Sequence, residues 1–63
     1  MNIKKIEAKL QKMSNKKITK IFKLVIPEEE LGEIEDDDFR QEVIDMIIEV
    51  IKEEDIEFDD IYL

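Results

Sequence analysis

One segment with an unusually wide apolar face constrains this fold most. At about 100° per residue, residues 39–52 place eight apolar side chains on an arc of about 200°. An ordinary surface helix needs an apolar stripe of only about 100°. The segment therefore predicts a helix with apolar surface for two contacts, one with its own fold and one with something else. The eight residues are Phe39, Val43, Ile44, Met46, Ile47, Ile48, Val50 and Ile51.

The ends of this helix are predicted from capping residues. Asp38 is a good N-cap, and Gln41 three residues later completes a capping box. The polar arc of the helix carries Glu42, Asp45 and Glu49. We expect the helix to run over residues 39–52.

Two segments have the composition of strands. Residues 18–26 (ITKIFKLVI) are rich in β-branched and aromatic residues and stop at Pro27. Residues 56–63 (IEFDDIYL) predict a weaker strand. Between the first strand and the helix, residues 28–38 contain eight acids and Gly32, which predicts a loop.

The N-terminal segment has two interpretations. Ile3, Ile6, Leu10 and Met13 fit a helical stripe, and the residue types agree with a helix. Ile6, Ala8 and Leu10 also alternate as in a strand. A hairpin turning at residues 15–17 gives each apolar residue of that strand an apolar neighbour and supplies the third strand that a small sheet needs. The cross-strand pairs are Leu10 with Phe22, Ala8 with Leu24, and Ile6 with Ile26.

We therefore predict an α+β fold of order ββαβ, a small three-stranded antiparallel or mixed sheet with one helix packed across it. The alternative is αβαβ, with an N-terminal helix. The single domain, residues 1–63, divides into a basic β-hairpin at 5–26, an acidic loop at 28–38, an amphipathic helix at 39–52 and a C-terminal strand at 56–63.

The 63 residues include neither cysteine nor histidine. Disulfides and zinc sites of the usual kind are excluded, so a second subunit or a partner is the expected source of extra stability. We expect a homodimer. No membrane span or signal peptide is visible, which predicts a cytoplasmic protein, in a host cell if the chain is viral.

Enzymatic chemistry has little support in these residues. There is no phosphate-binding glycine loop, and Ser14, the only serine, is interpreted as a turn residue. We expect no catalysis, no cofactor and no metal centre. Residues 33–38 hold five acids but lack the EF-hand pattern, so binding of a divalent cation there is left open.

Charge is strongly sorted along the chain. Residues 1–26 carry eight lysines and one acid, Glu7, whereas residues 27–63 carry seventeen acids and two cations, Arg40 and Lys52. The net charge of −8 and the shortage of stacking aromatics argue against direct binding of nucleic acid. The lysines are interpreted as protection of edge strands.

The acidic half carries the functional hypothesis. Closely spaced carboxylates imitate the phosphates of duplex DNA and compete for basic channels in nucleases and CRISPR effectors. The expected partner-binding residues are Glu28, Glu29, Glu30, Glu33, Glu35, Asp36, Asp37, Asp38, Glu42, Asp45, Glu49, Glu53, Glu54, Asp55, Glu57, Asp59 and Asp60.

This composition resembles that of the DNA-mimicking protein inhibitors of phages and plasmids, which include anti-CRISPR, anti-restriction and glycosylase-inhibitor proteins. The resemblance covers the charge of residues 28–60 and rests on no motif. It implies a non-enzymatic inhibitor that docks on the basic surface of a nucleic-acid-binding protein. The alternatives are a structural homo-oligomer and an antitoxin-like regulatory partner.

Overall fold

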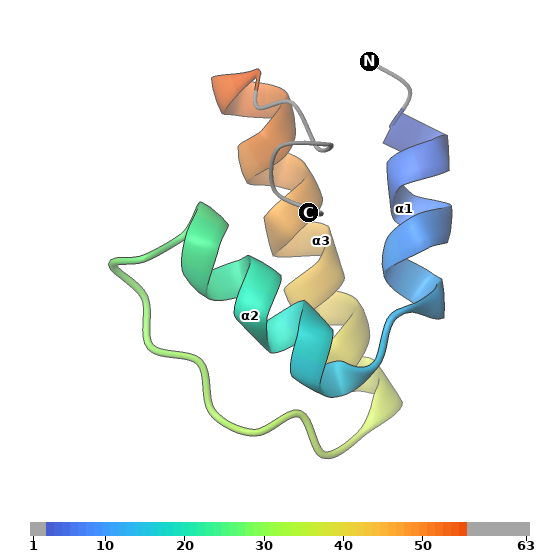
Figure 1. Ribbon diagram of the computed structural model, residues 1–63, viewed down its shortest axis with the longest axis vertical. Coiled ribbons are helices and arrows are strands. Elements are labelled where there is room, and N and C mark those ends of the chain that lie inside the picture. The colour runs from blue at the N-terminus through green and yellow to red at the C-terminus, as the bar shows by residue number, and fades with distance from the viewer. Residues whose placement is uncertain (1–2, 56–63) are drawn as a thin grey trace.

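The computed structural model describes residues 3–55, and over that range the fold is a bundle of three helices (Figure 1). Helix α1 spans Ile3–Lys12, α2 spans Asn15–Val25 and α3 spans Asp37–Glu54. Both α1 and α2 pack against α3, which is the longest helix. A loop of residues 26–36 leaves the end of α2 and swings around the outside of that helix to reach the start of α3.

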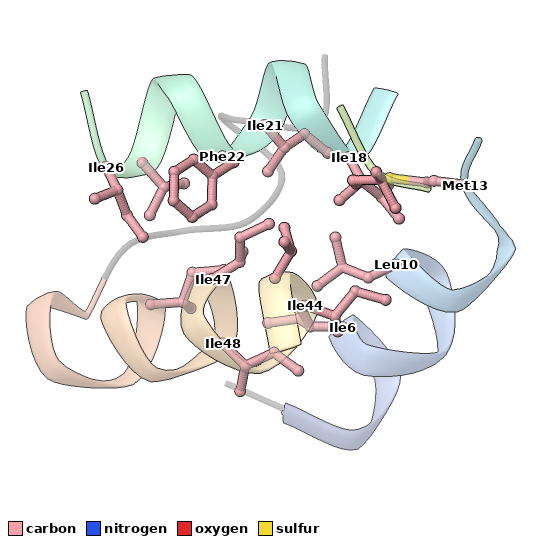
Figure 2. Packing of buried hydrophobic residues seen from close by; sticks show 14 residues of the cluster. Ile6, Leu10, Met13, Ile18, Ile21, Phe22, Ile26, Ile44, Ile47 and Ile48 are labelled. Carbon is pink, nitrogen blue, oxygen red and sulfur yellow. The ribbon is translucent and has the colours of Figure 1, made fainter. Parts of the chain in front are cut away.

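Helix α3 supplies the centre of the core. Val43, Ile44, Ile47, Ile48 and Ile51 are buried, and the side chains of all three helices converge on them (Figure 2). From α1 come Ile6 and Leu10, and from α2 come Ile18, Ile21, Phe22 and Val25. Five of the eight residues of the apolar arc predicted for α3 are buried against α1 and α2, whereas Met46 is 42% exposed. The homodimer stays a prediction.

The predicted sheet is wrong. The residues of the expected hairpin form α1 and α2, and residues 3–55 contain no strand. The expected strand at 56–63 lies outside the described residues. The N-terminal helix of the alternative, αβαβ, is present, but its first strand is absent as well.

The reason is visible in the spacing of the buried residues of α2. Ile18, Ile21, Phe22 and Val25 recur at i, i+3, i+4 and i+7, which is one face of a helix. Packing of that face on α3 outweighs the weak strand preference of β-branched residues. Ser14, interpreted as an ordinary turn residue, is the N-cap of α2, and its hydroxyl accepts a hydrogen bond from the amide of Lys17 at 3.2 Å.

Helix α3 begins two residues earlier than predicted. Asp36, not Asp38, is the N-cap, and its Oδ1 accepts a hydrogen bond from the Phe39 amide at 2.7 Å. The predicted capping box is replaced by other contacts of Gln41. Its Nε2 donates to Asp45 Oδ1 at 3.0 Å, and its Oε1 accepts from Gln11 Nε2 at 2.6 Å. At its other end the helix runs two residues beyond the predicted one, to a left-handed C-cap.

The turn between α1 and α2 is held by Arg40 of α3. Its Nη2 donates to the carbonyls of Gln11 and Met13, each at 2.8 Å, and to that of Leu10 at 3.4 Å. Its Nη1 donates to Asn15 Oδ1 at 2.6 Å. These carbonyls end α1, where the helix dipole is negative, so the cation satisfies unpaired acceptors and the dipole together.

Substitution of Ile21 and of Leu24 distinguishes the bundle from the predicted sheet. In the hairpin, Leu24 faces the helix across from Ala8, whereas in the bundle Ile21 is buried and Leu24 is 61% exposed. We expect Ile21→Ala to lower the free energy of unfolding by about 2–4 kcal/mol and Leu24→Ala by less than about 1 kcal/mol. Urea unfolding followed by circular dichroism measures both, and the reverse order would contradict the bundle.

Substitution of Arg40 tests its contacts with the turn. Arg40→Lys keeps the charge but loses the planar fork, so we expect a loss of about 1–2 kcal/mol in the free energy of unfolding. The matched control is Lys52→Gln, because Lys52 is an exposed cation on the same helix. Its effect should stay below about 0.5 kcal/mol. Equal stability of Arg40→Lys and the wild type in urea unfolding would refute this role.

Candidate functional site

The structure exposes every predicted partner-binding residue that it describes. Fourteen of the seventeen acids lie within residues 28–55, and all fourteen are exposed to solvent. Glu57, Asp59 and Asp60 lie outside the described residues. The fourteen do not form a single row, because the loop and α3 hold them on different elements. The loop carries Glu28, Glu29, Glu30, Glu33, Glu35 and Asp36; α3 carries Asp37, Asp38, Glu42, Asp45, Glu49, Glu53 and Glu54; Asp55 is its C-cap.

Five acids of α3 form a line that we call the acidic stripe. They are Asp38, Glu42, Asp45, Glu49 and Glu53, spaced by four, three, four and four residues. This spacing keeps all five on one face of the helix, opposite its buried side. At about 1.5 Å of rise per residue, the stripe is about 22 Å long.

A groove between α1 and α3 adds a sixth carboxylate. Glu7, the single acid of the basic half, lines the groove together with Asp45, Glu49 and Glu53 of the stripe. The groove has a volume of about 540 Å³. Ile3 and Ile48 give it an apolar part, and Lys52 is the cation on its wall. Four carboxylates from two helices that are far apart in sequence therefore line one groove.

The loop forms a second groove with α2, and this one is basic. Lys16, Lys20 and Lys23 of α2 line it together with Glu33 of the loop, and its volume is about 640 Å³. Leu31 and Ile34 supply apolar surface from the loop. The loop is tied to α2 where Asn15 Nδ2 donates to the carbonyl of Ile34 at 3.5 Å.

Two acidic side chains of the loop and of α3 have uncharged hydrogen-bond partners within the chain. Within residues 3–55, the side-chain carboxylates of Asp36 and Asp45 accept hydrogen bonds, and both donors, the Phe39 amide and the Gln41 side chain, are uncharged. Arg40, one of the two cations in residues 27–63, directs its guanidinium to carbonyl and amide oxygens at the α1–α2 turn. The five carboxylates of the acidic stripe are exposed to solvent.

No metal centre emerges from the described residues. Over residues 3–55, no three or more carboxylates come close enough together to hold a metal ion. The acids of residues 33–38, for which a divalent cation was left open, are all exposed side chains of the loop and the first turn of α3. Several exposed carboxylates close to one another attract cationic surfaces, because their electric fields add.

Comparison with protein-family models, with curated proteins and with solved structures gave no match to this chain. In the part of the chain that the structure describes, no helix combines the length and the apolar character needed to cross a membrane.

Sequence reasoning missed two features of these surfaces. The first is Glu7, whose approach to α3 depends on α1 being a helix. The second is the basic groove, because Lys16 was assigned to a hairpin turn and Lys20 and Lys23 to a strand. The signal was present in the spacing of Lys16, Lys20 and Lys23 at i, i+4 and i+7, which a helix places on one face.

Neutralising one carboxylate of the stripe should stabilise the fold. Asp45 lies three and four residues from two like charges, Glu42 and Glu49, and close to Glu7 across the groove. We expect Asp45→Asn, which retains an acceptor for Gln41, to raise the free energy of unfolding by about 0.5–1 kcal/mol at low salt. Urea unfolding measures this change, with Glu28→Gln in the loop as control. A loss of stability in Asp45→Asn would show that repulsion along the stripe is not significant.

Proposed function

We propose that this protein is a non-enzymatic inhibitor that docks its acidic stripe on the basic nucleic-acid-binding site of another protein, as a mimic of DNA. Nucleases and CRISPR effectors hold nucleic acid in such basic channels. The class of function is that of anti-CRISPR and anti-restriction proteins encoded by phages and mobile elements, acting in the cytoplasm. The observation that carries the proposal is the stripe of five exposed carboxylates on one face of α3.

The charge density of the stripe sets the kind of contact. Its five carboxylates follow one another at about 5–6 Å along the helix axis, whereas each strand of duplex DNA carries a phosphate about every 3.4 Å of axis. The stripe alone is therefore a sparser line of charge than one DNA strand. Glu7, from the neighbouring helix, adds a further negative charge beside the stripe at the α1–α3 groove. We expect the partner to contact α1 as well as α3 for this reason.

The rigidity of the stripe supports binding. The opposite side of α3 buries Val43, Ile44, Ile47, Ile48 and Ile51, so the backbone that carries the acids is fixed before a partner arrives. A preorganised surface loses less conformational entropy on binding than a chain that must first fold. This distinguishes the proposal from an antitoxin-like segment that folds on its partner.

The electric field of the stripe also affects the rate at which a partner associates. Opposite potentials steer two proteins together and accelerate association, and added salt weakens this effect. The Debye length falls from about 10 Å at 0.1 M to about 3 Å at 1 M salt, so complexes held by exposed charges dissociate as salt rises. Affinity that did not change over this range would exclude mimicry of DNA.

A capture experiment with matched variants tests the proposal. The immobilised protein should retain a nucleic-acid-binding protein from an extract of the cells in which it is produced, and duplex DNA should release that protein. Neutralising the stripe with Glu42→Gln, Asp45→Asn, Glu49→Gln and Glu53→Gln should weaken the complex at least about tenfold. Titration calorimetry or surface plasmon resonance with the purified partner measures the dissociation constant.

The control removes the same number of charges from the loop, by Glu28→Gln, Glu29→Gln, Glu30→Gln and Glu35→Gln. We expect a loss of less than about threefold, because these side chains lie on a different element. Equal losses in the two variants would mean that net charge alone drives binding. Unchanged binding of the stripe variant, or a partner that DNA does not displace, would reject the proposal.

A further inference from the structure

The three lysines of the basic groove form a line of their own, which we call the lysine stripe. Lys16, Lys20 and Lys23 are exposed and lie on the face of α2 opposite its buried residues. They line the groove in which Leu31 and Ile34 are the apolar residues of the loop. Neither the core nor the proposed contact with a basic partner uses this face.

The lysine stripe and the acidic stripe have matching registers. The lysines are spaced by four and then three residues, and Glu49, Asp45 and Glu42, taken in reverse order, have the same spacing. Two helices laid antiparallel would therefore bring three pairs of opposite charge together over about 10.5 Å. The pairs are Lys16 with Glu49, Lys20 with Asp45, and Lys23 with Glu42.

The exposed apolar residues agree with the same alignment. Leu24 is 61% exposed and Met46 is 42% exposed, and they are the two large apolar side chains that residues 3–55 leave in solvent. At about 100° per residue, Leu24 is rotated about 70° around the axis of α2 from the centre of the lysine stripe, and Met46 is rotated about 70° in the same direction around α3 from the centre of the acidic stripe. When two helices face each other antiparallel, positions rotated in the same direction lie at the same edge of the contact. The alignment that pairs the charges thus also brings Leu24 and Met46 to a common edge.

We propose that the lysine stripe binds the acidic stripe of a second copy of this chain. The two surfaces differ, so the contact is heterologous and joins copies into short chains or a closed ring. It uses Glu42, Asp45 and Glu49, which are also the centre of the surface proposed to dock on a basic partner. Self-association and partner binding therefore exclude each other at this face, although self-association needs no partner to be observed.

The net charge of −8 sets the conditions for this contact. Whole copies repel, but the molecule measures 30 × 24 × 20 Å, and the Debye length at physiological salt is about 8 Å. Repulsion between the bodies is then largely screened, whereas pairs in direct contact are screened much less. We expect association to be strongest near physiological salt and to weaken at about 0.5 M.

Sedimentation equilibrium of the full chain tests the proposal. Near 0.15 M salt, the average mass of the wild type should rise above 7.6 kDa as the concentration increases from about 0.02 to about 1 mM. Reversing two lysines, with Lys16→Glu and Lys20→Glu, should lower the association constant at least about tenfold. Reversing their partners, with Asp45→Lys and Glu49→Lys, should do the same.

An equimolar mixture of these two variants restores both pairings between unlike copies, so association should return to near the wild-type level. The matched control is Lys4→Glu with Lys12→Glu, which changes the net charge equally on exposed positions of α1 and should leave association within about threefold of wild type. Circular dichroism verifies the helicity of each variant. A monomeric wild type at the highest concentration, an equal effect of the control, or no recovery in the mixture would overturn the proposal.

Discussion

The contact of Arg40 with the end of α1 organises the rest of this small bundle. One guanidinium reaches the carbonyls of Gln11 and Met13 and the side chain of Asn15, so it joins the first turn of α3 to the turn between the other two helices. With that turn fixed, α1 and α2 lie on two sides of α3 and cover the five buried residues of its apolar arc. The same contact directs one of the few cations of the acidic half away from the carboxylates.

The arrangement explains how a chain with this charge and no cysteine can fold. Apolar residues of three helices fill one core, and no buried side chain within residues 3–55 is charged or polar. All of the charge is therefore left to the surface, where the acids of α3 repel one another along the stripe. A domain of this size has little stability to spare, so repulsion along the stripe is a significant cost to the fold.

Prediction from sequence succeeded for α3, because the residues that identify this helix all lie within its own segment. Eight apolar residues identified α3 to within two residues of each end, although its N-cap is Asp36 and not the predicted Asp38. A helical spacing was also present in α2, in Ile18, Ile21, Phe22 and Val25. A strand was predicted there instead, because β-branched residues favour strands and a hairpin offered apolar cross-strand pairs. The role of Arg40 and the approach of Glu7 to α3 could not be predicted, because both depend on how helices distant in sequence pack.

The central claim is that α3 presents its carboxylates as a fixed docking surface. Amide NMR spectra of the isotope-labelled protein test it most directly, recorded as the captured nucleic-acid-binding partner is added at a concentration at which sedimentation shows the free protein to be monomeric. The account predicts that signals of the stripe around Asp45 and of the facing part of α1 change first, while those of the lysine stripe on α2 change little. A footprint confined to the lysines of α2, or one spread evenly over the chain, would contradict it.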